Sequence, residues 1–202
     1  MCIRDSLLAE YGIVLPKGVS SLRRRLPELL EDAENGLSNR FRGLLAHGYQ
    51  QLLEFDEHIR FFTGELDRHA REHEPVQRLQ TIPGFGPVVA SAFYVQVGNG
   101  QDYRRGRDVS ASVGLVPKQH STGGKQVLLG ISKRGDRHLR SLLVHAARSV
   151  ARTAPGKSDR LSRWVSHLIA TRGMNKAVVA LANKLARIGW AVLRHQTVYH
   201  PA

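Results

Sequence analysis

Apolar residues recur at helical spacing along the first third of the chain. They predict two helices, near residues 22–33 and 38–73, with Ser20 or Ser21 capping the first and Asn35-Gly36 ending it. Within the second helix, apolar positions repeat every seven residues: Leu45, Leu52, Ile59 and Leu66, with Phe55 and Phe62 at the companion position. This heptad pattern is typical of a coiled-coil seam or a helical hairpin. A single helix of a compact bundle would show the same pattern, so both interpretations stay open here.

Three more amphipathic segments follow in the second half of the chain. Asp136 is a natural cap for the first, Ser158 or Asp159 for the second and Asn175 for the third. We therefore expect a mainly α protein, in which a long helical coiled-coil hairpin precedes a small α-helical domain. Glu74-Pro75 is the expected hinge, and the expected divisions are residues 1–6, a helical linker at 7–75 and a domain at 76–202.

A turn rich in glycine and proline interrupts the apolar pattern at residues 82–87. Its sequence, IPGFGP, has the form of a helix-hairpin-helix motif over about residues 79–98. In such a motif Gly84 and Gly86 permit a tight backbone, and the exposed N–H groups at the helix start favour a phosphate oxygen. A plain Gly/Pro turn between two packed helices is the alternative.

The charge pattern points to a polyanionic partner. The chain is 42% hydrophobic and has a formal net charge of +13. Residues 1–75 hold 10 Lys/Arg against 13 Asp/Glu, whereas residues 76–202 hold 20 against 4. Basic residues concentrated in one segment are typical of nucleic-acid binding. No apolar run approaches the roughly 18 residues of a membrane span, and the single cysteine forms no internal disulfide, so we expect a cytoplasmic protein with no membrane partner.

Residues 114–136, GLVPKQHSTGGKQVLLGISKRGD, form a basic, glycine-rich run that predicts a phosphate-gripping loop. The run lacks the GxxxxGK[ST] pattern of a P-loop. Ser121 is its candidate nucleophile, although the residues alone favour phosphate binding because a serine needs a base or a metal to activate it. The candidate nucleic-acid-binding residues in and around the run are Arg104, Arg105, Lys118, Gly123, Gly124, Lys125, Lys133, Arg134, Arg137 and Arg140. No metal site is expected in this chain, because a solvated face explains His58, His69 and His73 better than a ligand set.

Four segments together resemble a known family: TIPGFGPVVASAF, YRRGRDVSASVGLVPKQHSTGGK, LLGISKRGDRHLRSLLVHAARS and NKAVVALANKLARIGWAVL. They are similar to the C-terminal transposase domain of DEDD insertion-sequence transposases, the Piv/MooV-invertase-like recombinases whose type element is insertion sequence one hundred and ten. The segment from LLAEYGIVLP to LPELLEDAENGL resembles the helical linker before that domain. The resemblance covers about residues 7–195.

The resemblance implies an enzyme that binds DNA and catalyses its recombination. Ser121 would form the covalent link to DNA, with Gly123 and Gly124 as the glycines of its motif. A RuvC-like domain with four acidic residues would bind magnesium, a bridge RNA would pair with the DNA, and subunits would join through the coiled coil. Because no RuvC-like domain precedes Leu7, we expect an N-terminally truncated transposase that is inactive alone, with a non-native start at residues 1–6. The alternative is a non-enzymatic helix-hairpin-helix nucleic-acid-binding protein.

Overall fold

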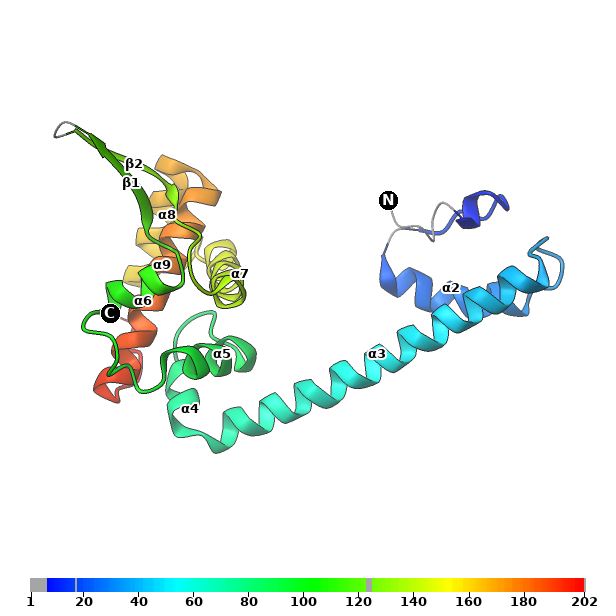
Figure 1. Ribbon diagram of the computed structural model, residues 1–202, viewed down its shortest axis with the longest axis horizontal. Helices are drawn as coiled ribbons and strands as arrows, with labels where there is room; N and C mark the ends of the chain where they lie inside the picture. The colour runs from blue at the N-terminus through cyan, green and yellow to red at the C-terminus, as the bar shows by residue number, and fades with distance from the viewer. Residues whose placement is uncertain (1–6, 17, 123–124, 202) are drawn as a thin grey trace. The chain divides into compact units, whose positions relative to one another are not determined.

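The computed structural model describes residues 7–16, 18–122 and 125–201, without the side chains of residues 121, 122, 125 and 126. The chain divides into two compact units, Met1–Gly64 and Glu65–Ala202, and is mainly helical, as the sequence predicts. Figure 1 shows the helices of both units and one β-hairpin. No helix among the described residues is long and apolar enough to cross a membrane.

The first unit is built on helices α2 (Val19–Glu31) and α3 (Asn39–Glu72). Their bounds lie within three residues of those predicted from the apolar spacing. Arg42 of α3 donates to the last carbonyls of α2, at 3.2 Å from Leu29 O and 3.0 Å from Leu30 O. Arg23 of α2 also pairs with Asp56 of α3. These contacts fold α2 back along the first part of α3, so the two helices lie side by side (Figure 1).

The heptad positions of α3 differ in exposure along the helix. Leu45 and Leu52 are half-buried, whereas Phe55, Ile59 and Phe62 are each more than 60% exposed. Exposed large apolar residues in one stripe are unusual on a surface that faces only water. The coiled coil therefore stays a prediction: these exposed residues would have to pack against a helix of another molecule.

The second unit is built around α9 (Met174–His195), the longest of its helices. Helices α4 (Glu74–Gln80), α6 (Gly106–Ser112), α7 (Arg137–Thr153) and α8 (Arg160–Arg172) pack against α9, and α5 (Pro87–Val97) packs against α4 and α7. One face of α9 is fully buried, including Leu181 and Leu185 at 0% exposure. Ala70, near the end of α3, also belongs to this core, so the second unit begins within α3.

The predicted caps of two of these helices are confirmed. Asp136 accepts from Leu139 N at 2.8 Å and Asp159 accepts from Ser162 N at 2.9 Å. The predicted Asn175 cap is wrong by two residues, because Gly173, with φ of 81°, ends α8 and directly precedes α9. A glycine adopts this conformation without the steric cost of a Cβ, so it lets two helices meet at one residue.

Helices α4 and α5 are joined by the Gly/Pro turn predicted at residues 82–87. Gly84 has a φ of 85°, and a Cβ there would lie 3.0 Å from Ala146 O of α7. Gly86 caps α5 and has open space around it. The close packing of Gly84 on α7 is by itself a reason for a glycine at this position. Phosphate binding by this turn therefore stays a prediction.

The basic run at residues 114–136 is not the loop that the sequence predicts. It forms an antiparallel hairpin of β1 (Pro117–Thr122) and β2 (Lys125–Ile131), with a register shift between Pro117 and Gln119 (Figure 1). The pairing of the two strands includes the β-branched residues Val127 and Ile131 of β2, which suit a strand, although the rest of the run is typical of a loop.

The base of the hairpin closes through two glycines. A Cβ on Gly114 would lie 2.1 Å from Arg134 O, and a Cβ on Gly135 would lie 1.6 Å from Ser112 O. Both glycines have positive φ, 71° and 77°. Gly114 O also accepts from Lys133 N at 3.1 Å. The two ends of the run can therefore meet only because neither residue has a side chain.

Candidate nucleic-acid interface

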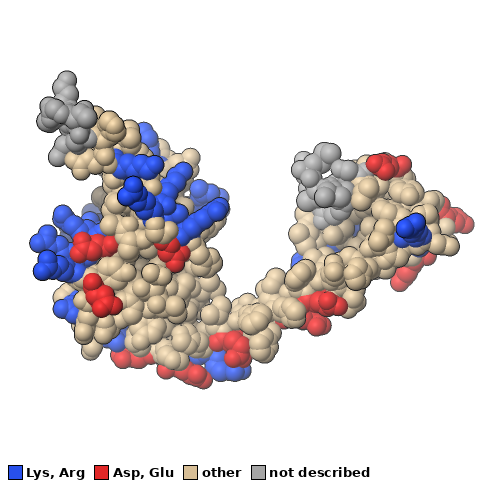
Figure 2. All heavy atoms as spheres, in the orientation of Figure 1, with Lys and Arg blue, Asp and Glu red and all other residues tan. Residues whose placement is uncertain are grey.

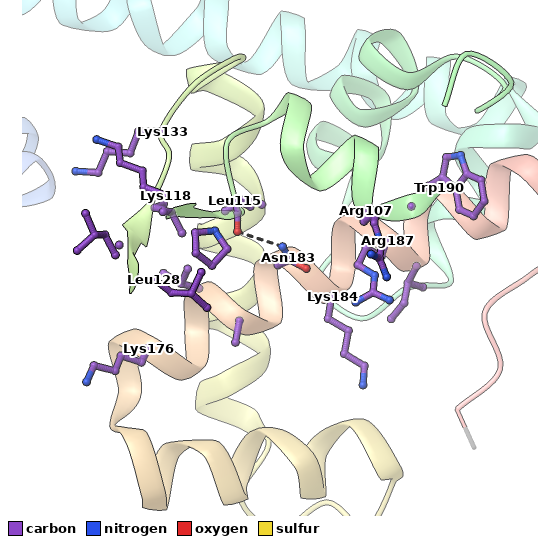
Figure 3. Close-up of a pocket in the computed structure, with 18 of the residues that line it drawn as sticks. Arg107, Leu115, Lys118, Leu128, Lys133, Lys176, Asn183, Lys184, Arg187 and Trp190 are labelled. Atoms are coloured by element: carbon purple, nitrogen blue, oxygen red, sulfur yellow. Dashed lines mark hydrogen bonds between the residues drawn. The ribbon is translucent and has the colours of Figure 1, made fainter. Parts of the chain in front are cut away.

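An open groove of about 1620 Å³ lies within the second unit, between the hairpin, α6, α8 and α9. Figure 3 shows its labelled basic side chains, which come from α6, the hairpin segment and α9. The cationic residues that line it are Arg105, Arg107, Lys118, Lys133, Lys176, Lys184 and Arg187. No Asp or Glu is found among the described lining residues. Seven cations with no acidic neighbour in the lining make a site for an anion.

Between these cations the groove is apolar. A half-buried face of α9 contributes small and branched residues, and the hairpin contributes two exposed leucines: Val179, Ala180, Ile188, Ala191, Leu128 and Leu129. Trp164 of α8 and Trp190 of α9 also line the groove. The groove thus combines charged edges with an apolar surface.

Two hydrogen bonds hold the walls of the groove together. Asn183 of α9 donates from Nδ2 to Leu115 O at 3.1 Å, as the dashed line in Figure 3 marks. Ser110 of α6, which is fully buried, donates to Asn183 O at 3.2 Å. Gly106 allows α6 to approach α9, since a Cβ there would lie 3.2 Å from Arg187 Cα. The start of α6 therefore lies against Arg187 of α9, and its neighbours Arg105 and Arg107 line the same groove.

Lys184 is the least solvated cation of the groove. Its Nζ lies 4.3 Å from the centroid of the Trp164 ring. Burial lowers the pKa of the Lys184 ammonium, and the charges of Arg160 and Arg187 lower it further. None of the ion pairs found among the described residues includes Lys184 or another groove cation. An anion bound here would offset an electrostatic cost that the free chain carries.

Three of the predicted binding residues meet in this groove: Arg105, Lys118 and Lys133. Arg104, Arg134 and Arg137 are exposed but do not line it. Lys and Arg side chains gather on the second unit around and below the hairpin, as Figure 2 shows. The predicted patch is therefore broader than the groove.

Arg140 has a structural role that the sequence does not reveal. It is half-buried, and its Nη1 donates to Val113 O at 2.9 Å and to Arg134 O at 3.2 Å. These carbonyls flank the two glycines at the base of the hairpin. Arg140 therefore joins α7 to the hairpin, and its role in binding stays a prediction.

The candidate nucleophile lies near the end of the hairpin. The backbone of Ser121 is in β1, paired with Gln126 of β2. Gly123 and Gly124 are outside the described residues, and so are the side chains of Ser121 and Lys125. Gly84 and Gly86 belong to the α4–α5 turn and do not line the groove.

Four groove cations were not among the predicted binding residues: Arg107, Lys176, Lys184 and Arg187. Three of them are on α9, where 3.6 residues per turn bring positions 176, 184 and 187 to one face. This spacing is a signal that the sequence carries. The sequence shows these residues as positive surface on the last helix but does not single them out as binding residues, because the apolar pattern emphasises the buried face of the same helix.

Fold and groove together define a basic, mainly helical domain with a cationic groove that a β-hairpin borders. Residues 76–162 of this chain match the family described as "Transposase IS116/IS110/IS902 family". The matched segment contains α6, the hairpin and α7, and stops just after the start of α8.

Relatives named as transposases extend the similarity over nearly the whole chain. The transposase for insertion sequence element IS1111A of Coxiella burnetii is 46% identical over 193 residues, which are 96% of this chain and 53% of the relative. The transposase for insertion sequence element IS1328 of Yersinia enterocolitica is 41% identical over 96% of this chain and 57% of the relative. A probable family 20 transposase of Pseudomonas aeruginosa is 39% identical over 96% of this chain and 58% of the relative. The chain thus spans just over half the length of these relatives.

Proposed function

We propose that this chain is the nucleic-acid-binding, C-terminal part of a transposase that binds DNA and takes part in its recombination. The observation that carries the proposal is the groove of the second unit, whose seven cations lack any acidic partner among the described lining residues. The similarity to transposases supports it.

Ser121 is the proposed nucleophile. Its backbone lies in β1, three residues beyond Lys118 of the groove, so the proposal places the scissile phosphodiester toward the end of the hairpin. In this step Ser121 Oγ forms a bond to phosphorus while the P–O bond to a sugar oxygen breaks. The serine proton leaves to a base, and the leaving sugar oxygen takes up a proton.

The resemblance to DEDD transposases also implies that magnesium takes part in this step. Among the described residues no three His, Cys, Asp or Glu side chains come together, so this part of the chain does not fit a magnesium site. We propose that the magnesium ligands belong to a RuvC-like domain of the full-length enzyme. The residues described here would bind and orient the nucleic acid.

Two partners belong to the same proposal. The exposed stripe of Phe55, Ile59 and Phe62 on α3 suits a second copy of the helix, and a coiled coil would make the enzyme a homo-oligomer. A bridge RNA that pairs with DNA would bring a second polyanion to a chain with a net charge of +13.

Covalent trapping tests the serine. The chain is mixed with DNA and a RuvC-like domain from a relative, and denaturing gels show whether a protein–DNA adduct forms. We expect an adduct with the native chain, none with Ser121→Ala, and equal DNA binding by both. Efficient adduct formation by Ser121→Ala would overturn the serine assignment. Binding without an adduct under any condition would favour a non-enzymatic nucleic-acid-binding protein.

A further inference from the structure

Trp164 occupies an unusual place in the groove. The side chain is half-buried and packs against the core, yet it also lines the groove. The Lys184 ammonium lies 4.3 Å from the centre of its ring, and Arg187 lines the same groove from the next turn of α9. An aromatic ring and two cations thus lie together at an open surface.

The apolar surface between the cations restricts what fits the groove. A DNA or RNA duplex presents phosphates on its outside but keeps the faces of its bases stacked inside, so it cannot stack a base on Trp164. An unpaired nucleotide presents a flat base face and a phosphate together. Aromatic side chains in basic grooves are the usual means of binding single strands.

The Lys184 side chain can adjust to such a ligand. No ion pair among the described residues holds its ammonium, and a lysine is a compact charge on a flexible stem. Moving the ammonium from the ring to a neighbouring phosphate would clear the indole face for a base. The same movement would give an uncompensated cation its counter-ion.

We propose that Trp164, Lys184 and Arg187 form a subsite for an unpaired nucleotide, with the base stacked on Trp164 and the phosphate held by the two cations. The inference rests on the proposed function, because it names the form of nucleic acid that the groove accepts. DNA and RNA single strands share this chemistry, and the test separates them.

Binding is measured by fluorescence anisotropy with three probes: an oligothymidylate, an oligouridylate and a DNA duplex hairpin of mixed sequence. The variants are Trp164→Leu, which removes the aromatic face, and Trp164→Phe, which keeps one. Ile169→Val, on the same helix but outside the groove, is the matched control. Thermal unfolding checks that all of them fold.

We expect Trp164→Leu to bind at least one single strand about 5- to 20-fold more weakly and Trp164→Phe to stay within about threefold of the native chain. Duplex binding should change by less than about twofold in both. Whichever single strand is affected identifies the source of the nucleotide. Equal effects of the two variants, or equal losses for duplex and single strands, would overturn the subsite.

A second readout does not depend on altering Trp164. The chain has two tryptophans, so Trp190→Phe leaves Trp164 as the fluorophore. Because Trp190 lines the groove and donates to Gly100 O at 3.0 Å, the thermal unfolding and the probe affinities of Trp190→Phe are first compared with those of the native chain. We expect single strands to quench its emission and the duplex to leave it nearly unchanged. Bound single strands that do not quench would contradict the subsite while leaving the proposed function intact. A chain that binds none of the three probes would instead contradict the proposed function.

Discussion

At the residue scale, Lys184 illustrates how a binding groove costs stability. Its pKa lies below the ordinary lysine value of 10.5, first because of burial and then because of Arg160 and Arg187. The folded chain therefore holds this proton less tightly than the unfolded chain does. The charged form destabilises the fold at neutral pH; this cost decreases as the pH rises above the folded pKa and is gone above the unfolded value of 10.5.

Lys184→Met should consequently stabilise the free chain and weaken binding. We expect the unfolding free energy at neutral pH to rise slightly, because solvent screens a partly exposed ammonium, and the gain to shrink toward pH 10.5. Nucleic-acid affinity should fall, with a salt slope smaller by about 0.7–0.9. Lys157→Met, on the exposed α7–α8 connection, is the control and should change neither. A destabilised Lys184→Met variant with native binding would contradict this role.

The glycines at the base of the hairpin give a second residue-scale prediction. In Gly135→Ala the new Cβ would lie 1.6 Å from Ser112 O at a φ of 77°, so the backbone must move. We expect a loss of about 2–4 kcal/mol, measured by chemical denaturation. Gly130→Ala, in the same hairpin with nothing within 4 Å, is the control and should cost less than about 1 kcal/mol. Similar losses for both variants would contradict the close approach.

At the element scale, the hairpin depends on α7 through Arg140. Arg140→Gln removes the guanidinium that donates to Val113 O and Arg134 O. Both carbonyl oxygens at the base of the hairpin then lose this hydrogen bond. We expect a loss of about 1–3 kcal/mol and faster amide exchange in β1 and β2. Arg148→Gln, exposed on the same helix, should leave both unchanged. Unaltered exchange in Arg140→Gln would show that the hairpin holds without this link.

Helix α3 provides the prediction for self-association. Ile59→Glu places a charge in the exposed heptad stripe and should weaken association measured by sedimentation equilibrium by about tenfold or more. Gln50→Glu, which adds the same charge to an exposed position outside the stripe, should leave association unchanged. A chain that is monomeric in its native form would contradict the coiled coil directly.

The elements differ in how far the sequence predicts them. Helices α2, α3, α7 and α8 follow from apolar spacing, and the predicted caps Asp136 and Asp159 begin α7 and α8. The predicted cap of α2 at Ser20 or Ser21 is wrong, because both serines lie inside the helix, which Gly18 precedes. The hairpin does not follow from local signals, because its closure depends on Gly114 meeting Arg134 and Gly135 meeting Ser112, contacts about twenty residues apart. Glycines and lysines near its tip are typical of a loop, and only the non-local pairing turns the run into strands.

The candidate site shows the same limit. Arg105, Lys118 and Lys133 could be found because they flank a recognisable basic run. Lys176, Lys184 and Arg187 belong to a helix whose dominant signal is its buried face, and their meeting with the hairpin is a tertiary event. The sequence predicts a binding role for Arg140, because the burial of a side chain and its backbone partners are not visible in a sequence.

At the scale of the whole molecule, charge is divided along the chain. The acidic residues are concentrated before residue 76, and the cations of the groove come from positions 105–187. Electrostatic attraction should therefore act on the second unit, and it should weaken with salt because bound phosphates release counter-ions. If the chain served only for self-association through α3, its nucleic-acid affinity would be weak, and substitutions of the groove cations would not change it.

The salt dependence of binding tests the groove most directly. Affinity for a single strand is measured against salt concentration for the native chain and for two triple variants. The groove variant carries Lys176→Gln, Lys184→Gln and Arg187→Gln. The control variant carries Arg148→Gln, Arg152→Gln and Lys157→Gln. Both variants lose three charges from the second unit. We predict that the slope of log affinity against log salt falls by about 2 in the groove variant and by less than about 1 in the control. Equal slopes in the two variants would contradict binding in this groove.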